Sequence, residues 1–162
     1  MIGHHPTLPR GNLRFLFRKA TYKSQDCGRT TIVDDELRKK TQETANRLFG
    51  KGIKMDPPYL TWKEFDRNLA NDLSMFITGK LYSRTVLTLP ERQMVACAML
   101  GALRATDELK LHVNAALNVG CDPKKLAEVF FQLAPYAGMP AVNEALRVYR
   151  DVLKERGEWP VK

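Results

Sequence analysis

Cysteines are scarce in this sequence, and so are long apolar runs. The 162 residues include only 3 cysteines, Cys27, Cys97 and Cys121, an odd number without the spacing of metal ligands, and no signal peptide precedes them. We therefore expect free thiols in the cytoplasm or the mitochondrial matrix, and no secreted disulfide framework. The longest apolar run, 94–103, falls short of the roughly 18 residues that cross a bilayer. Neither secretion nor a membrane-spanning segment is predicted.

Histidines are equally few. The sequence contains 3 of them, and His4 and His5 lie in an N-terminal segment with glycine and proline. His112 is the only histidine inside a predicted regular element. Imidazole chemistry is therefore assigned to His112, and no metal site is predicted.

Acidic residues are missing from the N-terminal segment. The first is Asp26, and the basic residues before it are Arg10, Arg14, Arg18, Lys19 and Lys23. Such a composition is typical of an organelle-targeting leader, and it suits equally a basic arm that docks on a partner. The sequence thus predicts a basic arm, 1–33, before one domain, 34–162, because a chain of this length has the size of a single domain.

The net charge of +8 favours an acidic partner. Nucleic acid, anionic lipid and a carboxylate substrate would all be attracted by such a field. Nucleic-acid binding ranks last, because the sequence has no helix-turn-helix, zinc-ligand or other base-reading motif.

Helix signals dominate the chain beyond the arm. The alternation that marks strands is confined to 82–87. We therefore expect an all-α fold, a compact bundle of about six helices. The first helix is capped by Asp34 or Asp35 and stops at Gly50, and a loop, 51–60, follows.

The second predicted helix carries a large apolar face. Thr61 and Glu64 form a capping box at its start, and it ends near Gly79. The residues on the face are Trp62, Phe65, Leu69, Leu73, Phe76 and Ile77. This face covers either the protein's own core or a contact with a second subunit.

Four further helices have recognisable starts. Thr88 and Glu91 form a capping box around Pro90. The other three helices start at Thr106, Asp122 and Pro140 and stop at Gly120, Gly138 and Gly157. Pro135 is expected to break one backbone hydrogen bond near the end of the helix from Asp122.

Six motifs in the segment 89–157 resemble the carboxymuconolactone decarboxylase family. They are Leu-Pro-Glu-Arg at 89–92, Glu-Leu-Lys-Leu-His-Val at 108–113, Ala-Leu-Asn-Val-Gly at 116–120, Pro-Lys-Lys-Leu-Ala-Glu-Val at 123–129, Tyr-Ala-Gly-Met-Pro-Ala at 136–141 and Ala-Leu-Arg-Val at 145–148. The resemblance implies an alkylhydroperoxidase D-like helical subunit. It also implies a ring-like homo-oligomer, such as a hexamer.

The sequence departs from the peroxidase-like branch of that superfamily. Where that branch carries Cys-x-x-Cys-x-x-x-His, this chain has Ala105, Glu108 and His112, and where it carries an earlier glutamate, this chain has Gln93. Thiol-peroxidase chemistry is therefore not predicted, because no thiolate is placed to attack a peroxide. The remaining Glu-x-x-x-His pattern resembles the lactone-decarboxylase branch.

Decarboxylation of an unsaturated lactone requires an oxyanion to be stabilised and a proton to be delivered to carbon, and it needs no metal or organic cofactor. The resemblance implies His112 as general acid, and Glu108, four residues earlier, would favour its protonated form. Arg92, Tyr136 and Arg104 are candidates for binding a small anionic substrate. The alternative is that His112 is a core residue and Glu108 only complements the helix dipole.

A second hypothesis assigns the chain no catalysis. The arm, 1–33, which the family pattern lacks, and the missing redox cysteines suit an accessory subunit of a larger, mitochondrial assembly. That hypothesis predicts a filled or blocked space beside His112. The enzyme hypothesis predicts a cavity there.

Overall fold

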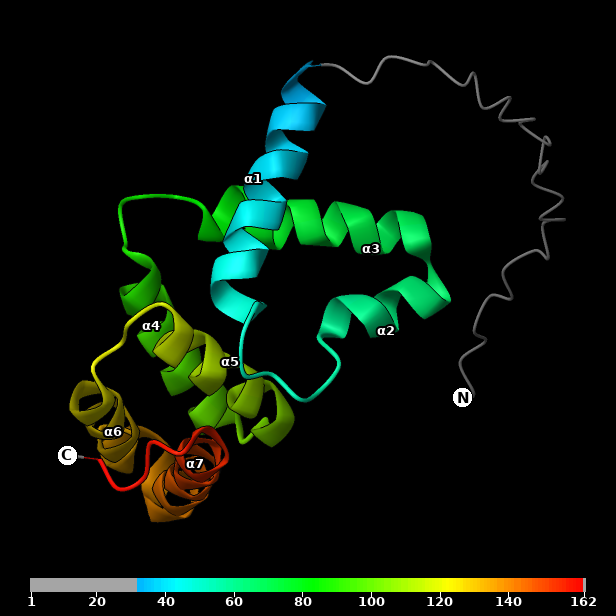
Figure 1. Ribbon diagram of the computed structural model, residues 1–162. Coiled ribbons are helices and arrows are strands. Elements are labelled where there is room, and N and C mark those ends of the chain that lie inside the picture. The colour runs from blue at the N-terminus through cyan, green and yellow to red at the C-terminus, as the bar shows by residue number, and fades with distance from the viewer. Residues whose placement is uncertain (1–31, 162) are drawn as a thin grey trace, which may run out of the picture.

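A computed structural model describes residues 32–161, and every regular element in that range is a helix. The elements are α1 (Ile32–Phe49), α2 (Pro58–Phe65), α3 (Arg67–Ser74), the π-helix η1 (Met75–Tyr82), α4 (Leu89–Leu103), α5 (Thr106–Asn118), α6 (Pro123–Phe131) and α7 (Ala134–Arg156) (Figure 1). The predicted all-α class is confirmed. The predicted arm lies almost wholly outside the described residues, and no helix within them is long and apolar enough to cross a membrane.

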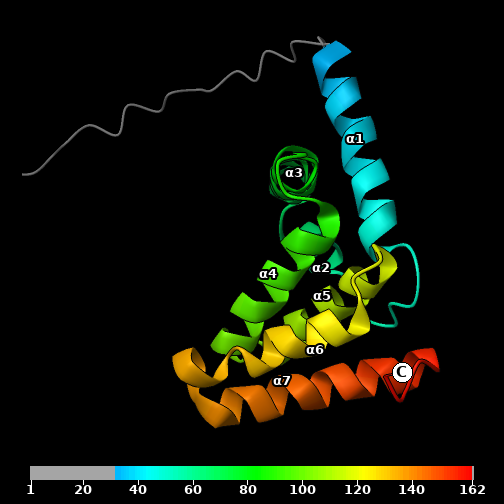
Figure 2. The same cartoon turned by 90° about the vertical axis from the view of Figure 1, so that its left-hand side faces the viewer.

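The helices form two groups. Figure 2 shows α4 to α7 packed together at one end, while α1 and α3 rise away from them. Helix α1 connects the groups, because it packs on both η1 and α5. The site described below lies between the two groups.

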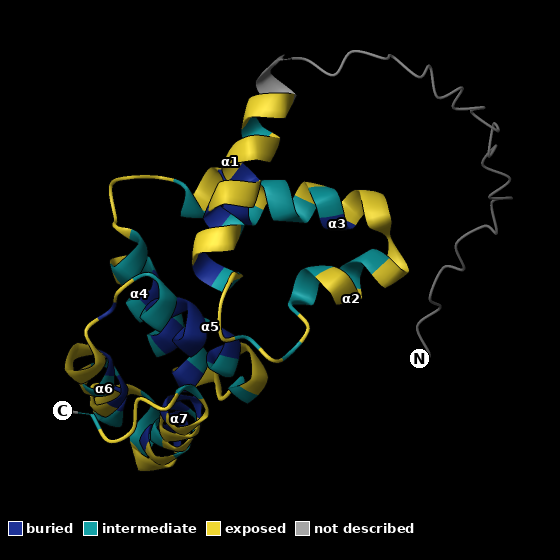
Figure 3. Cartoon of the chain, viewed as in Figure 1, coloured by how far each residue is buried: buried dark blue, intermediate teal, exposed yellow. Residues whose placement is uncertain are grey.

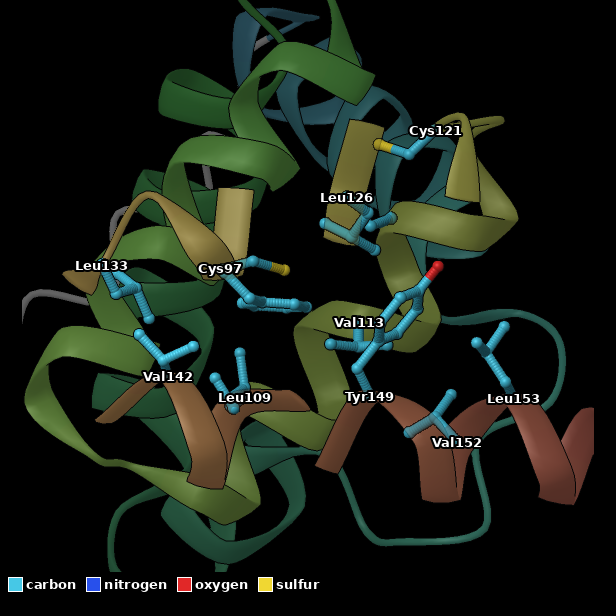
Figure 4. Packing of buried hydrophobic residues seen from close by; sticks show 13 residues of the cluster. Cys97, Leu109, Val113, Cys121, Leu126, Leu133, Val142, Tyr149, Val152 and Leu153 are labelled. Atoms are coloured by element: carbon cyan, nitrogen blue, oxygen red, sulfur yellow. The ribbon is translucent and has the colours of Figure 1, made fainter. Parts of the chain in front are cut away.

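Most of the buried apolar side chains belong to α4–α7. Figure 3 shows the buried residues concentrated there, and Figure 4 shows their side chains pointing toward one another. The cluster consists of Cys97, Leu109, Val113, Ala116, Cys121, Leu126, Phe130, Leu133, Val142, Ala145, Tyr149, Val152 and Leu153. Because burial of apolar area is the main stabilising contribution to folding, helices α4–α7 form the hydrophobic core that supports the other helices.

The predicted starts of α4, α5 and α6 and the stop at Gly157 are confirmed, whereas α6 ends at Phe131 and α7 starts at Ala134, so the predicted stop at Gly138 and start at Pro140 fall at the bend inside α7. Thr88 Oγ1 accepts from the Glu91 backbone N–H, and Glu91 Oε2 accepts from the Thr88 N–H at 2.7 Å, which completes the predicted capping box. The Asp122 carboxylate caps α6. Helix α7 is bent at the non-helical Gly138 (φ 78°) and ends at Gly157 in the left-handed region (φ 73°), as glycine permits.

The predicted starts of the first two helices are wrong. Helix α1 already begins at Ile32, so neither Asp34 nor Asp35 is its cap. Helix α2 begins at Pro58, in the predicted loop 51–60, because a proline in the first turn has no N–H that needs an intrahelical partner. Thr61 therefore lies inside α2, and the predicted capping box with Glu64 does not form.

The single helix predicted up to Gly79 is in fact three elements. Asp66 adopts an extended conformation (φ −151°) and ends α2, and its carboxylate accepts from the Asn68 and Leu69 N–H groups, both at 2.9 Å. Such a cap is worth about 1 kcal/mol, enough to favour a restart over a continuous helix. The chain then continues past Gly79 as η1, and the predicted apolar face is divided among α2, α3 and η1.

Pro135 also lies elsewhere than predicted. It stands in the first turn of α7, after α6 has ended at Phe131, and therefore breaks no helical hydrogen bond. With these changes residues 32–161 form seven α-helices and one π-helix instead of six helices.

Gly79 permits a close approach of η1 to α1. A Cβ at this position would meet Thr41 Oγ1 and would lie 3.0 Å from Leu37 Cδ1, both on α1. Any larger residue at this position would force the side chains of Thr41 and Leu37 to shift. The contact matters for the site, because Thr41 and residues next to Gly79 line the same cavity.

Candidate functional site

A cavity of about 750 Å³ lies between α1, α2, η1 and α5. Its wall includes both His112 and Glu108, which are neighbours on α5. Arg38 and Glu108, which also line it, are exposed, so the cavity communicates with solvent. The space beside His112 is therefore neither filled nor blocked by the described residues.

The His112 side chain is held between two aromatic rings. Phe49 of α1 and Tyr82 of η1 each lie edge-to-face with the imidazole, at centroid distances of 6.2 and 6.4 Å. Leu109 and Val113, on either side of it in α5, are fully buried in the α4–α7 core. His112, like Leu111 and Glu108, thus lies on the side of α5 that faces the cavity.

Gln93 of α4 orients the imidazole. Its Oε1 lies 2.8 Å from His112 Nδ1, and the residue has no exposed surface. Since an amide oxygen can only accept, this orientation of the Gln93 amide assigns the hydrogen of the bond to Nδ1 and, in a neutral imidazole, the lone pair to Nε2. Gln93 Nε2 is enclosed and has no hydrogen-bond partner among the described residues.

The sequence that forms much of this site matches known proteins. The model of the carboxymuconolactone decarboxylase family matches residues 70–151, from α3 through most of α7. The chain belongs to the carboxymuconolactone decarboxylase family. The matched stretch contains His112, Gln93 and Tyr82, whereas α1 and α2, which form the opposite wall of the cavity, precede it.

Two relatives named as decarboxylases accompany this match. The chain is 35% identical to the 4-carboxymuconolactone decarboxylase of Acinetobacter baylyi over 99 residues, which cover 61% of this chain and 74% of that one. It is 25% identical to the nitrosuccinic acid decarboxylase of Metarhizium robertsii over 130 residues, 72% of this chain and 91% of that one. An uncharacterised 15.0 kDa protein of Paracoccus denitrificans is 32% identical over 83 residues, 49% of this chain and 61% of its own length.

The electrostatic environment of His112 differs from the expectation. Burial lowers the pKa of His112 below its ordinary value of 6.5, and the nearby Glu108 carboxylate opposes this shift without cancelling it. Glu108 thus favours the protonated imidazole, as predicted, but burial has the larger effect on the pKa of His112. The resting imidazole of this family member is neutral at pH 7.

The three other predicted site residues do not line this cavity. Arg92 lies beside Tyr82 and donates from Nη2 to the Arg84 carbonyl at 3.3 Å. Arg104 pairs with Glu144 at 3.0 Å, and Tyr136, at the start of α7, is 81% exposed. The structure therefore brings His112 and Glu108 together, and substrate binding by the other three stays a prediction.

Sequence reasoning overlooked three residues around the site. Gln93 was interpreted only as a replaced glutamate, because in the sequence it follows Glu91 and Arg92 and resembles a surface residue. Arg38 is the single guanidinium on the described cavity wall, but it resembles any surface charge of α1 in the sequence. Tyr82 was missed because it lies in the segment 82–87, whose alternation suggested a strand.

The two described cysteines are not nucleophiles for this site. Cys97 is fully buried and Cys121 nearly so, and both lie in the α4–α7 core. Burial raises the pKa of Cys121 to about 11 and that of Cys97 still further. Neither thiol is ionised near neutral pH, and the absence of thiol-peroxidase chemistry stays a prediction.

We predict that His112 titrates below pH 6.5 in the folded protein, because its charged form loses hydration on burial. Proton NMR of the imidazole C–H resonances measures this. Replacing Glu108 by Gln should lower the midpoint further, and replacing Gln93 by Glu should raise it, since a carboxylate would then face Nδ1. A midpoint at or above 6.5 in the unaltered protein would contradict the burial of the ring.

The same shift has a consequence for stability. As the pH falls through 6.5, the unfolded chain takes up this proton before the folded one does, so the folded state is destabilised until the pH falls below the folded pKa. The His112→Gln variant should lose this part of the pH dependence of unfolding. If the free energy of unfolding depended on pH in the same way in this variant as in the unaltered protein, His112 would contribute nothing to that dependence.

Proposed function

We propose that this chain is a cofactor-independent decarboxylase of a small organic acid. The observation that carries the proposal is the Gln93-bound imidazole of His112 in the wall of a solvent-connected cavity, with Glu108 one turn away. The family and the names of two relatives, decarboxylases of a carboxymuconolactone and of nitrosuccinic acid, support the reaction class. Both named acids leave, on loss of carbon dioxide, a carbanion that an adjacent electron-withdrawing group can delocalise onto oxygen.

The residues suggest how the steps are divided. The bond between the carboxylate and its carbon breaks, carbon dioxide leaves, and the electron pair moves to an oxygen of the remaining molecule. His112 then supplies a proton from Nε2 to the carbon and regains one from water, as general acid. Because the resting imidazole is neutral, entry of the anionic substrate must first raise its pKa, which a nearby carboxylate does.

Arg38 is suited to hold the substrate. It lies on the α1 wall of the cavity and is the single guanidinium or ammonium group among the described lining residues. A guanidinium matches the planar geometry of a carboxylate. Because α1 precedes the stretch that the family model matches, this wall is where the choice of substrate can differ between relatives.

The accessory-subunit hypothesis has less support. It predicted a space beside His112 that is filled or blocked, whereas a cavity of about 750 Å³ adjoins the ring. Docking through the arm and a mitochondrial location concern residues outside the described range, and both stay predictions.

The test of the reaction uses purified full-length protein with 4-carboxymuconolactone and nitrosuccinate, and it measures carbon dioxide release. His112→Ala should lower kcat/KM by about 10²- to 10⁴-fold, the usual contribution of a general acid. Arg38→Gln should mainly raise KM, while Arg38→Lys keeps part of the affinity. The surface variant Arg150→Gln is the control. Release by His112→Ala equal to that of the unaltered protein would refute the assignment.

We further propose that the chain forms a homo-oligomer, in agreement with the ring that the resemblance implied. Val95, Met99 and Leu103 recur at four-residue spacing on α4 and are 45%, 61% and 76% exposed. Residues at this spacing share one face of a helix, and nothing in the described part of the chain covers it. An apolar stripe of this kind suits a contact with a second copy.

Native mass spectrometry tests the assembly. We expect a multiple of the 18.5 kDa chain mass, and Met99→Glu should shift the distribution toward the monomer, because it places a charge inside the contact. The matched control is Val86→Glu, at an equally apolar and 84% exposed position away from α4. A monomer at all concentrations would refute this proposal and leave the cavity unaffected.

A further inference from the structure

The proposed decarboxylation requires a hydrogen-bond donor that none of the predicted residues supplies in this cavity. The electrons released with carbon dioxide collect on an oxygen, and a positioned donor lowers the energy of that charge. Arg92, Arg104 and Tyr136 were the candidates from the sequence, and none of them lines the cavity. The donor is therefore to be sought among the groups that surround His112.

Most neighbours of His112 are unsuited to the task. Phe49 is apolar, and the Glu108 carboxylate accepts hydrogen bonds when it is ionised. Gln93 has a spare N–H group, but that atom is completely enclosed and its oxygen already binds His112. Tyr82 remains, with its ring 6.4 Å from the imidazole and at 89° to it.

The Tyr82 hydroxyl is available. It lines the cavity and forms no side-chain hydrogen bond with the described residues, in contrast to Tyr59 on the same wall, whose hydroxyl donates to Asn71 Oδ1 at 2.9 Å. In the described range, the side-chain polar atoms that are both enclosed and without a hydrogen-bond partner are Arg92 Nε and Gln93 Nε2. The Tyr82 hydroxyl oxygen is not among them, so it is not fully enclosed. Tyr82 thus combines a place in the cavity wall beside His112 with a hydroxyl that no described side chain occupies.

We propose that Tyr82 is the oxyanion donor of the His112 cavity. Its O–H donates a hydrogen bond to the oxygen of the substrate that takes up the electron pair, while His112 delivers the proton to carbon. This inference rests on the proposed function, since it assigns a further catalytic residue to the same reaction.

The surroundings of Tyr82 suit a donor. Burial raises the pKa of the phenol, the Cys97 thiol adds to this effect and Arg92 opposes it, so the hydroxyl keeps its proton at neutral pH. Tyr82 closes η1, and Thr78, one turn earlier and buried, lines the same cavity. The π-helix thus presents both side chains to the cavity, and π-helical turns are frequent at functional sites.

The first measurement compares turnover in Tyr82→Phe, which removes one oxygen and keeps the ring beside His112. We expect kcat to fall by about 10²- to 10³-fold, as on removal of one oxyanion donor, with little change in KM. The NMR titration of His112 should stay within the range of the unaltered protein, which separates loss of the donor from disruption of the site. Tyr136→Phe tests the competing phenol from the sequence.

The second measurement needs no turnover. The probe is 4-nitrophenolate, whose absorption band shifts when its oxygen accepts a hydrogen bond. The unaltered protein should bind it with such a shift, and Tyr82→Phe should bind it at least 10-fold more weakly and without the shift, in line with the loss of one charged hydrogen bond. Tyr149→Phe, whose hydroxyl binds the Pro123 carbonyl in the core, is the control for the loss of any phenol.

The two measurements separate this inference from the reaction. If the probe shift depends on Tyr82 but neither acid is decarboxylated, the donor stands and the proposed reaction falls. If decarboxylation occurs and Tyr82→Phe equals the unaltered protein in both measurements, the donor is refuted and the reaction stands. Absence of probe binding to the unaltered protein, or loss of the shift only in Tyr136→Phe, would also overturn the assignment.

Discussion

The hydrogen bond between Gln93 and His112 decides what chemistry the cavity can perform. A neutral amide at Nδ1 fixes the tautomer of the ring without the charge that would hold it as an imidazolium. Burial then keeps the resting ring neutral, so that its protonation depends on what enters the cavity. In the proposed reaction, an anionic substrate would raise the pKa of the imidazole on entry and so create the general acid.

The two groups of helices serve this bond in different ways. The core of α4–α7 fixes Gln93 and the backbone of His112, because Cys97 on α4 and Leu109 and Val113 on α5 are completely buried in one cluster. The α1 and η1 walls line the cavity, and these two helices approach each other at Gly79. The family match covers α4, α5, α6, η1 and most of α7 but not α1, so under our proposal the α1 wall is where relatives can differ in the choice of substrate.

The sequence was sufficient for the fold class and for most ends of α4–α7, because Thr88, Asp122 and Gly157 act through local hydrogen bonds and backbone angles, but it placed the boundary between α6 and α7 too late. The sequence did not predict the helix break at Asp66, because aspartate is equally common on helix surfaces. It also did not predict the π-helix η1, because the wider turn of a π-helix leaves no pattern in the sequence. His112 and Glu108 were found through the family motif. Gln93, 19 residues away, and Arg38 were missed, because only tertiary packing brings them to the site.

The tautomer of His112 is the most direct test of this view. Nitrogen-15 NMR of the imidazole, recorded above pH 7 in the full-length protein, distinguishes a protonated ring nitrogen from one with a lone pair. We predict a protonated Nδ1 and a bare Nε2, and loss of this preference in Gln93→Met, which keeps the side-chain volume but removes the acceptor. A hydrogen on Nε2 in the unaltered protein, or a tautomer indifferent to Gln93, would contradict the role assigned to this bond.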